Sequence, residues 1–496
     1  MGNPASIQTI DGSARYTGPH DIPTSSPDGL LLNPAPTAPF PFTPPVSSLG
    51  NPLQQITWGF DSALKTPYSE LVDLSVTREL PGGIVFEAAY VGRFAHRLLQ
   101  QRDLAMPLDL KDPKSGTDYF AAATALAKLA NANTPVGQVP QIPYWENLFP
   151  HAAGVTNDPQ GQFGCGGAPG QAAVTNPTAT QSMYELFFCN WGASTLGATN
   201  FQNIFDSFCF PACANINGVD TPYAFYNKEF SALYAWSSIG ASAYNSGQFT
   251  LRSPAKHGLQ FDFNYVLSKS IDVGSDAERV PTYGGLSAII NTWSPTQLRS
   301  PSDFDARHQI NANWVYDLPV GRGRRFGAGW NRLEDSLLGG WQLSGIYRWT
   351  SGFPFSVDAG GTFNTNFQLE GKAELVGAAP KQKLTFINGD PFAFNFGSAD
   401  PGSFFRLPFP GESGARNNFR GQGFFGIDMG VNKTFHFTEQ QTLRFSAYAY
   451  NLTNSVRFDP ATLTNNSAVT NPTTIGLYSG TLTKPRVMEF ALRYQF

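Results

Sequence analysis

Four cysteines are the residues whose type and spacing constrain chemistry most in this 496-residue chain. They are Cys165, Cys189, Cys209 and Cys213. Zinc sites favour cysteine pairs about two to four residues apart; only Cys209 and Cys213 fit, and the nearest histidine in sequence is His151. We therefore expect disulfides formed in an oxidising compartment, with free thiols as the alternative. The sequence leaves all three pairings of the four cysteines open.

Other patterns that carry chemistry are missing from the sequence. It contains no nucleophile elbow, no metalloprotease helix and no P-loop, so we predict neither an enzyme nor a bound cofactor or metal. Segment 321–327 (GRGRRFG) has the wrong spacing for a dinucleotide loop, and we expect its arginines at a membrane rim, near lipid head groups or solvent. Asp303 and Asp305 offer two carboxylates to a cation, but a solvated loop is the preferred interpretation.

The composition indicates a protein of strands, turns and loops. Acidic and basic residues nearly balance, at 37 and 33, which argues against a nucleic-acid-binding surface. Charged residues make up 14% of the chain, against roughly 25% in soluble domains. No apolar run approaches the length of about 18 residues typical of a transmembrane helix. The first residues lack the basic start and apolar core of a signal peptide.

The last residues, 486–496, alternate strictly between apolar and mostly polar side chains. One face carries Met488, Phe490, Leu492, Tyr494 and Phe496. Because side chains alternate across a strand, and about 9–11 residues span a bilayer when tilted, this segment is typical of the closing strand of an outer-membrane β-barrel. An edge strand of a soluble sandwich is the alternative, since alternation alone does not separate the two.

Further segments alternate in the same way, so we expect about ten strands in all. They lie around 72–77, 84–90, 249–251, 259–268, 309–316, 341–350, 427–432 and 443–450. Charged residues on their polar faces are expected to line a lumen or to contact a plug, and hydrated wall residues without a binding role are the alternative. These residues are Glu87, Arg252, Asp262, Arg348, Asp428, Arg444, Glu489 and Arg493.

The connections between these segments alternate in length. Short or basic links at 81–83, 253–256, 319–338 and 438–440 alternate with long connections at 93–241, 270–305, 351–423 and 452–485. In an antiparallel meander this rhythm places every long loop on one side, as in outer-membrane barrels. The sequence therefore predicts an all-β fold over residues 70–496: a transmembrane antiparallel β-barrel portion, open or partial, with long outer loops.

Two segments outside the strands also have a predicted structure. Residues 1–69 are rich in proline and poor in periodicity, so they are predicted to be extended. Residues 118–132 are rich in alanine and leucine and predict a helix within the first long loop. Asp118 is placed to cap the first turn of that helix, because an aspartate oxygen accepts hydrogen bonds from free backbone N–H groups there.

Five stretches resemble barrel hairpins of TonB-dependent outer-membrane receptors of the Oar-like type, which is common in Acidobacteria. They are 75–98 (SVTRELPGGIVFEAAYVGRFAHRL), 244–272, 302–321, 339–357 and 447–454 (AYAYNLTN), in order along the chain. The resemblance implies a barrel of about 22 strands closed by a plug, often with a carboxypeptidase-regulatory-like domain before the plug. It also implies that outer loops capture a ligand, which the lumen conducts once an inner-membrane energy source pulls the plug.

The chain departs from that family pattern. We find no signal peptide, TonB-contacting segment or plug in the sequence, so we expect the C-terminal half of a receptor barrel, as a fragment, a truncated gene or the product of a misplaced start. The first strand, about 70–80, is then expected to be an unpaired edge of an open, curved sheet.

The resemblance also implies partners and a location. The expected partners are outer-membrane lipid and the barrel-assembly machinery, which would inspect the terminal strand at Phe496. A plug and TonB are expected in an intact receptor, and nucleic acid is not. In the outer membrane of a Gram-negative cell the long loops would be extracellular and the C-terminus periplasmic.

Two other functions stay open at this point. The chain is alternatively a structural or adhesive surface protein whose barrel anchors large loops. A secreted soluble β-protein such as a carbohydrate-binding module, with aromatic stripes that stack on sugars, is a third interpretation. Strict alternation over about ten strands is better explained by lipid. The sequence does not indicate which ligand would be transported.

Overall fold

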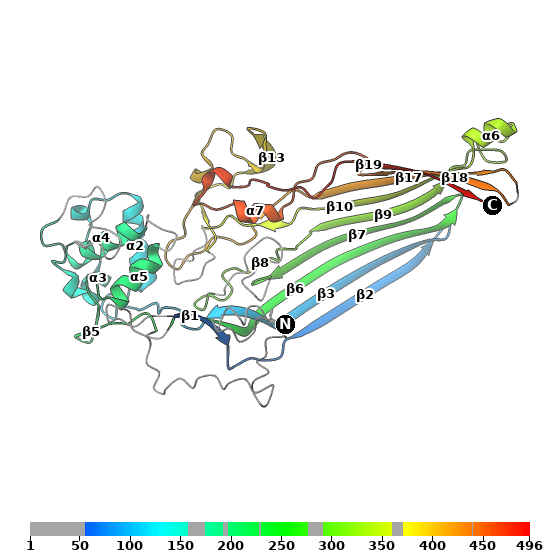
Figure 1. Ribbon diagram of the computed structural model, residues 1–496. Helices are drawn as coiled ribbons and strands as arrows, with labels where there is room; N and C mark the ends of the chain where they lie inside the picture. Colours follow the sequence, from blue (N-terminus) through cyan, green and yellow to red (C-terminus); the bar gives the residue numbers. More distant parts are fainter. Residues whose placement is uncertain are drawn as a thin grey trace, which may run out of the picture.

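The main element of the structure is a long, twisted sheet of eleven strands (Figure 1). The computed structural model describes residues 55–156, 174–191, 197–227, 230–275, 291–359, 371–438 and 440–496. One continuous path runs through most of the sheet, in the order β19-β18-β17-β10-β9-β7-β6-β3-β2. The bounds of these strands are β2 (Tyr68–Leu80), β3 (Ile84–Asp103), β6 (Phe230–Lys256), β7 (Leu259–Asp272), β9 (His308–Asp317), β10 (Trp341–Thr350), β17 (Phe424–His436), β18 (Thr442–Tyr450) and β19 (Val487–Gln495).

Each neighbouring pair of strands on this path is antiparallel. The path ends at β2 and at β19, and within the described residues these two strands do not pair with each other. The sheet is therefore open, with two free edges. The prediction of an antiparallel barrel portion that is not closed is confirmed.

Cross-strand pairing separates two faces of the sheet. One row, across six strands, holds apolar residues and one glycine: Phe261, Trp314, Gly345, Met429, Ala449 and Met488. A row on the other side, across five strands, is polar: Glu87, Thr250, Asn264, Asn311 and Arg348. We call these the apolar face and the polar face. A slip of one residue would exchange them, so the alternation in the sequence sets this register.

The apolar face of the terminal strand is not covered by the rest of the chain. Phe490 is 67% exposed and Leu492 is 70% exposed, although both are large apolar side chains. Soluble proteins rarely expose a contiguous apolar surface over several strands. The exposure therefore indicates a surface that contacts something other than water.

Two strands run well beyond the segments that the sequence predicts for them. β3 continues to Asp103 and β6 begins at Phe230, so the first long connection spans 104–229 rather than 93–241. The extensions pair with each other through register shifts on either side of Leu98, and Arg97 has a left-handed φ of 56°. Such bulges interrupt the strict alternation of a strand, which is why the sequence pattern ends early.

Two short strands extend the sheet outside the main path. β1 (Gln55–Phe60) pairs in parallel with the extension of β6, inside the segment 1–69 for which the sequence predicts no strand. Residues 1–54 of that segment lie outside the described residues. β8 (Ser300–Pro301) pairs with the end of β7. Both short strands lie at the long-loop end of the sheet.

The first long connection folds into a helical unit, which we define as the described residues of 104–227 (Figure 1). It contains α2 (Tyr119–Asn131), η2 (Val136–Gln138), α3 (Pro143–Leu148), η3 (Pro150–Ala152), α4 (Ala179–Trp191), α5 (Gly197–Ser207), β4 (Ala214–Ile216) and β5 (Val219–Thr221). The Asp118 side chain accepts a hydrogen bond from the N–H of Ala121 at 2.8 Å, so the predicted helix and its cap are confirmed. Edge-on aromatic pairs such as Tyr119 with Phe225 fill the core of the unit.

The later long connections form a second compact part, the loop cluster, defined as the described residues of 351–423 and 451–486. It contains β11 (Pro354–Phe355), β12 (Glu374–Leu375), β13 (Lys381–Ile387), β14 (Asp390–Asn395), η4 (Pro401–Phe404), β15 (Phe405–Arg406), β16 (Phe419–Arg420), α7 (Ala461–Asn466) and η5 (Pro472–Thr474). Phe394 is fully buried at its centre, against Phe355 and Phe419. The bounds of 351–423 are those that the sequence predicts.

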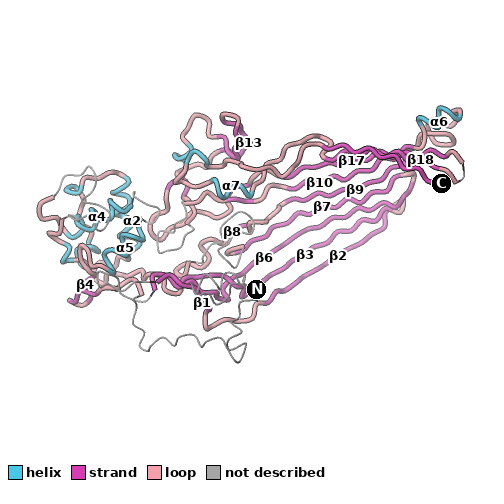
Figure 2. Tube along the Cα trace, viewed as in Figure 1, coloured by secondary structure: helices cyan, strands magenta, loops and turns pink. Residues whose placement is uncertain are grey.

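The helical unit and the loop cluster lie at one end of the sheet, and α6 (Arg332–Leu338) lies at the other end beside the C-terminus (Figure 2). The alternation of short and long connections produces this division. Among the described residues, no helix combines the length and the apolar character needed to cross a membrane. The large connections are therefore gathered on one side of the sheet, where they form the candidate site.

Candidate functional site

The polar face of the sheet carries ion pairs between neighbouring strands. Arg252 on β6 lies 3.0 Å from Asp262 on β7, and Arg348 on β10 lies 3.1 Å from Asp428 on β17. Both arginines are more than half exposed, so water screens these pairs and they contribute little stability. They neutralise charge along a hydrated wall.

The other charges predicted on the polar face have weaker contacts. Arg444 lies 3.4 Å from the amide oxygen of Asn432, and Glu489 lies 3.3 Å from the Tyr450 hydroxyl. Arg444 and Arg493 are direct cross-strand neighbours, so two like charges face each other there. Like charges opposite each other destabilise a strand pair, and an acidic group placed between them would remove that cost.

Arg416 joins the loop cluster to the end of strand β7. Its guanidinium forms an ion pair with Asp272, the last residue of β7, and lies 3.4 Å from Asp303. The side chains of Arg416 and Asp272 are 4% and 5% exposed. Asn417 adds a hydrogen bond to Asp303 at 2.6 Å. Because removing one partner would leave a buried charge uncompensated, this pair fixes the loop cluster on the sheet.

Asp303 and Asp305 are both engaged by arginine, so the prediction of a solvated loop is wrong. Asp305 forms an ion pair with Arg420, and its side chain is 1% exposed. It also accepts a hydrogen bond from the N–H of Ser270 at 2.7 Å. Within the described ranges no three potential metal-binding side chains come together. The two carboxylates hold loops in place.

Phe409 links the loop cluster to the helical unit. Its side chain is 8% exposed and belongs to the core of the helical unit, with its ring 6.3 Å from that of Trp191. The Arg406 guanidinium lies 4.1 Å from the centre of the Phe409 ring, a cation–π contact. Nearby, Thr124 donates a hydrogen bond to the carbonyl oxygen of Pro410 at 3.4 Å. The two compact parts therefore share one apolar contact region.

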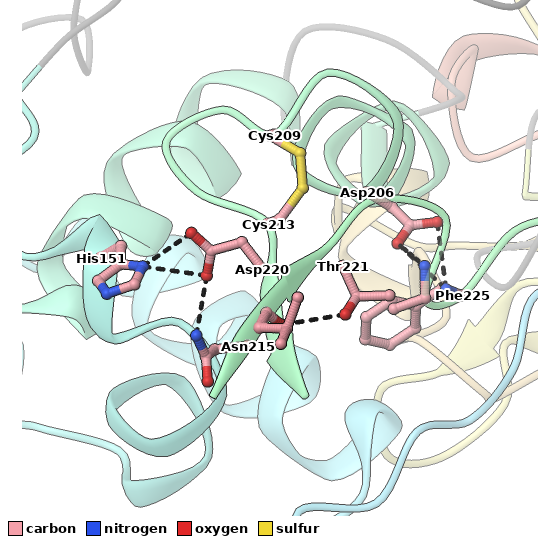
Figure 3. Close-up of a disulfide and its surroundings, with 10 residues drawn as sticks. His151, Asp206, Cys209, Cys213, Asn215, Asp220, Thr221 and Phe225 are labelled. Atoms are coloured by element: carbon pink, nitrogen blue, oxygen red, sulfur yellow. Dashed lines mark hydrogen bonds and ion pairs between the residues drawn. A yellow bond between two sulfur atoms is a disulfide. The ribbon is translucent and has the colours of Figure 1, made fainter. Parts of the chain in front are cut away.

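Three of the four cysteines, Cys189, Cys209 and Cys213, lie in the helical unit. A disulfide joins Cys209 to Cys213 and closes the short loop between α5 and β4 (Figure 3). Cys189, in α4, is also disulfide-bonded, and Cys165 lies outside the described residues. His151 pairs with Asp220 at 2.8 Å on the surface of the unit. Cys209 and Cys213, the pair with zinc-like spacing, are therefore joined in a disulfide.

Asp206 holds the returning chain against the helical unit (Figure 3). Its fully buried carboxylate accepts hydrogen bonds from the backbone N–H groups of Ala224, Phe225 and Tyr226. Burial raises its pKa to about 6, while the three backbone hydrogen bonds act in the opposite direction. The buried carboxylate therefore anchors the segment that leads into β6.

Several residues of this site escape sequence reasoning. Arg416 and Phe409 lie in segments without periodicity, and they contact Asp272 and Trp191, which are far away in sequence. Asp206 lies near the end of helix α5, and its backbone partners follow 18 to 20 residues later in a loop that no sequence pattern indicates. The predicted terminal residues Phe490, Leu492, Tyr494 and Phe496 do lie on one exposed face, but at the opposite end from the loops. Within the first long connection, the helix at 118–132 was the single folded element that we predicted from the sequence.

Comparison with known proteins gives the family. A family model described as an outer membrane beta barrel domain matches residues 3–489. No curated protein matches in sequence.

Three solved structures that are similar to this chain are each much longer than it. They include the outer membrane transporter YddB from Escherichia coli, with 9% identity and a TM-score of 0.34, covering 90% of this chain and 35% of that one. The pyoverdine outer membrane receptor FpvA from Pseudomonas aeruginosa, bound to pyoverdine, has 10% identity and a TM-score of 0.33, covering 90% and 32%. A mutant of the ferric enterobactin receptor PfeA from Pseudomonas aeruginosa has 10% identity and a TM-score of 0.30, covering 87% and 31%.

The chain thus spans about a third of the length of these structures. The family match, by contrast, covers nearly all of it. The chain belongs to the outer membrane beta barrel domain family.

Proposed function

We propose that this chain is the C-terminal part of the barrel of a TonB-dependent outer-membrane receptor, which takes up a ligand captured by its loops. The observation that carries the proposal is the open sheet with a polar face and preorganised loops at one end. The ion pairs of Arg416 and Arg420 and the contact of Phe409 hold those loops in one arrangement. Rigid loops cost less conformational entropy when they bind a ligand.

The directions of the edge strands support an incomplete barrel. Because eight successive pairings are antiparallel, β2 and β19 run in the same direction. Two such edges can join only in parallel, so closing an all-antiparallel barrel needs an odd number of additional strands. Nine strands lie on the main path of the sheet. A transporter barrel of about 22 strands would therefore need about 13 more, and 13 is an odd number. An upstream segment of the same receptor is the source that we propose for them.

The polar face supports a plug inside that barrel. Among the described residues of this face, Arg348 and Arg493 are exposed and Glu87 is half-buried. A lumen of this size is filled by a folded plug in the large outer-membrane transporters. TonB, acting on that plug, would supply the energy for uptake. In this orientation the long loops are extracellular and the C-terminus is periplasmic.

Protease treatment of intact cells tests the orientation. A protease added outside is expected to cleave within 104–229, while an epitope tag inserted in the turn 81–83, at the same end of the sheet as Phe496, stays intact until the outer membrane is opened. Cleavage of the tag in intact cells would contradict the orientation. Extraction of the chain without detergent would contradict its place in a membrane.

The compact helical unit favours a second candidate, a surface protein that uses the barrel only as an anchor. Its core is independent of the sheet, as expected for a displayed module. Labelled compounds, tested on cells with and without a protonophore, separate the two functions. Energy-dependent accumulation supports uptake, whereas surface binding that the protonophore leaves unchanged supports an anchor.

A further inference from the structure

The connection between β9 and β10 protrudes at the short-turn end of the sheet and exposes apolar side chains. Within it, α6 presents Leu333, Leu337 and Leu338, which are 69%, 58% and 56% exposed. Phe326 in the preceding loop is 54% exposed. Figure 1 shows α6 beyond the ends of β17 and β18, beside the C-terminus. A water-soluble turn would not carry four large apolar side chains so openly.

Arginines lie close to these apolar side chains in the sequence. Arg322 and Arg324 precede α6, and Arg332 begins it. Their side chains form no ion pair within the described part of the chain. The three arginines line an open cavity of about 990 Å³ between this connection and the ends of β9, β10, β17 and β18. Asp317 and Asp335 also line it, so basic residues outnumber acidic ones there without being the sole charges. Unpaired guanidinium groups are suited to phosphate, which they bind through two parallel hydrogen bonds.

Lys433 shows which side of the sheet the connection covers. It lies on the apolar face, where Trp341 and Phe445 are its cross-strand neighbours, and it is 3% exposed. Its ammonium group donates a hydrogen bond to the carbonyl oxygen of Gly339 and lies 5.3 Å from the centre of the Trp341 ring. Trp341 in turn donates a hydrogen bond to the carbonyl oxygen of Leu337 at 3.0 Å. The end of α6 is therefore bonded to the rim of the apolar face.

We propose that this connection binds the periplasmic leaflet of the outer membrane, with the leucines of α6 at the boundary of the acyl chains and Arg322, Arg324 and Arg332 on the phosphates of anionic phospholipids. The inference rests on the proposed orientation of the barrel. Apolar and basic side chains on one short segment are the combination by which peripheral helices lie in a membrane interface. The position at the rim of the lipid-facing side brings both groups to the level of the head groups.

The same segment also explains how a lysine is tolerated on the apolar face. Lys433 would otherwise bring an unpaired charge to the edge of the hydrocarbon. The carbonyl oxygen of Gly339 and the ring of Trp341 satisfy that charge, and α6 separates it from the lipid. We call residues 321–339 of this connection the rim anchor.

Nitroxide depth measurements on the full chain in phosphatidylglycerol nanodiscs test the rim anchor. One label is attached through Leu337→Cys on α6, one through Leu343→Cys on the apolar face of β10, and one through Asp390→Cys in the loop cluster. The chain without an added cysteine measures background labelling. We expect the labels at 337 and 343 to be accessible to oxygen, and the label at 337 to be about tenfold less accessible to a water-soluble nickel complex than the label at 390.

Charge variants test the role of the arginines. The triple variant Arg322→Gln, Arg324→Gln and Arg332→Gln is expected to raise nickel accessibility at position 337 about tenfold. A matched variant, Lys111→Gln, Lys114→Gln and Lys381→Gln, removes three exposed charges at the other end of the sheet and is expected to change nothing. An unchanged depth in the arginine variant would overturn the proposed contact with phosphate.

The outcomes separate the two proposals. A label at 337 in water, with the label at 343 in the bilayer, overturns the rim anchor and leaves the barrel function standing. Labels in water at both positions overturn both. A label at 337 shielded from oxygen and nickel alike would mean that protein covers α6, and would overturn the assignment to lipid.

Discussion

The indole of Trp314 on β9 covers Gly345 on the adjacent strand β10, and the two residues are direct cross-strand partners on the apolar face. A Cβ atom added at Gly345 would lie 2.1 Å from the indole ring. Glycine is therefore required at this position by the close approach of the ring. The Trp314 ring therefore lies against the backbone of β10, within the apolar row that runs from Phe261 to Met488.

Gly345→Ala is expected to displace Trp314 and destabilise the sheet by about 1–3 kcal/mol, the usual cost of overpacking. The measurement is the denaturant midpoint of the full chain in detergent, followed by tryptophan fluorescence. Gly247→Ala is the control, because an added Cβ there would lie 3.6 Å from the nearest ring atom, an ordinary contact. Equal midpoints for the two variants would contradict the role of the pair.

Phe409→Ala is expected to separate the helical unit from the loop cluster, because the side chain is the main contact that the loop cluster inserts into the other core. Loss of a buried phenylalanine costs about 3–5 kcal/mol. Limited proteolysis should then cut within 104–229 at a lower protease concentration than in the unmodified chain. Phe386→Ala, which removes a ring that is 60% exposed, should leave the cleavage pattern unchanged.

Arg416→Met is expected to destabilise the loop cluster by about 3–5 kcal/mol, because Asp272 would keep a buried charge without its partner. Arg252→Met removes an arginine from a pair whose side chains are 59% and 34% exposed, so its cost should stay below about 1 kcal/mol. Hydrogen exchange of residues 371–423 in the full chain measures the difference. Similar protection in both variants would argue against Arg416 as the attachment point.

The contrast between sheet and loops shows what the sequence could predict. Leu343, Phe445 and Leu492 alternate with polar neighbours, and alternation is a local property, so it predicts both the strands and their faces. The bulges near Leu98 interrupt that pattern, and β3 and β6 therefore run further than predicted. Arg416 and Asp272 are far apart in sequence and have no periodic signal, so only the folded chain brings them together. The same holds for Phe409, whose partners lie in another connection.

The stability of the helical unit should fall as pH rises between about 4 and 6. Burial raises the pKa of Asp206 from 3.8 to about 6. The folded state then binds a proton more tightly than the unfolded chain does. The resulting contribution is fully present below pH 3.8 and is lost as pH rises through about 6. A shift of this size corresponds to about 3 kcal/mol of unfolding free energy.

Asp206→Asn isolates this contribution, because asparagine does not titrate in that range. The difference in unfolding free energy between the two proteins should change by about 2 kcal/mol from pH 4 to pH 6, because part of the full contribution is lost only above pH 6. Urea unfolding of the full chain, followed by tryptophan fluorescence, provides the measurement at each pH. Burial raises the pKa of Asp109 to about 6 as well, so the variant should keep part of the pH dependence. A difference that is constant across this range would mean that Asp206 is already ionised at pH 4 in the folded chain. Its three backbone hydrogen bonds would then outweigh the cost of burying the charge.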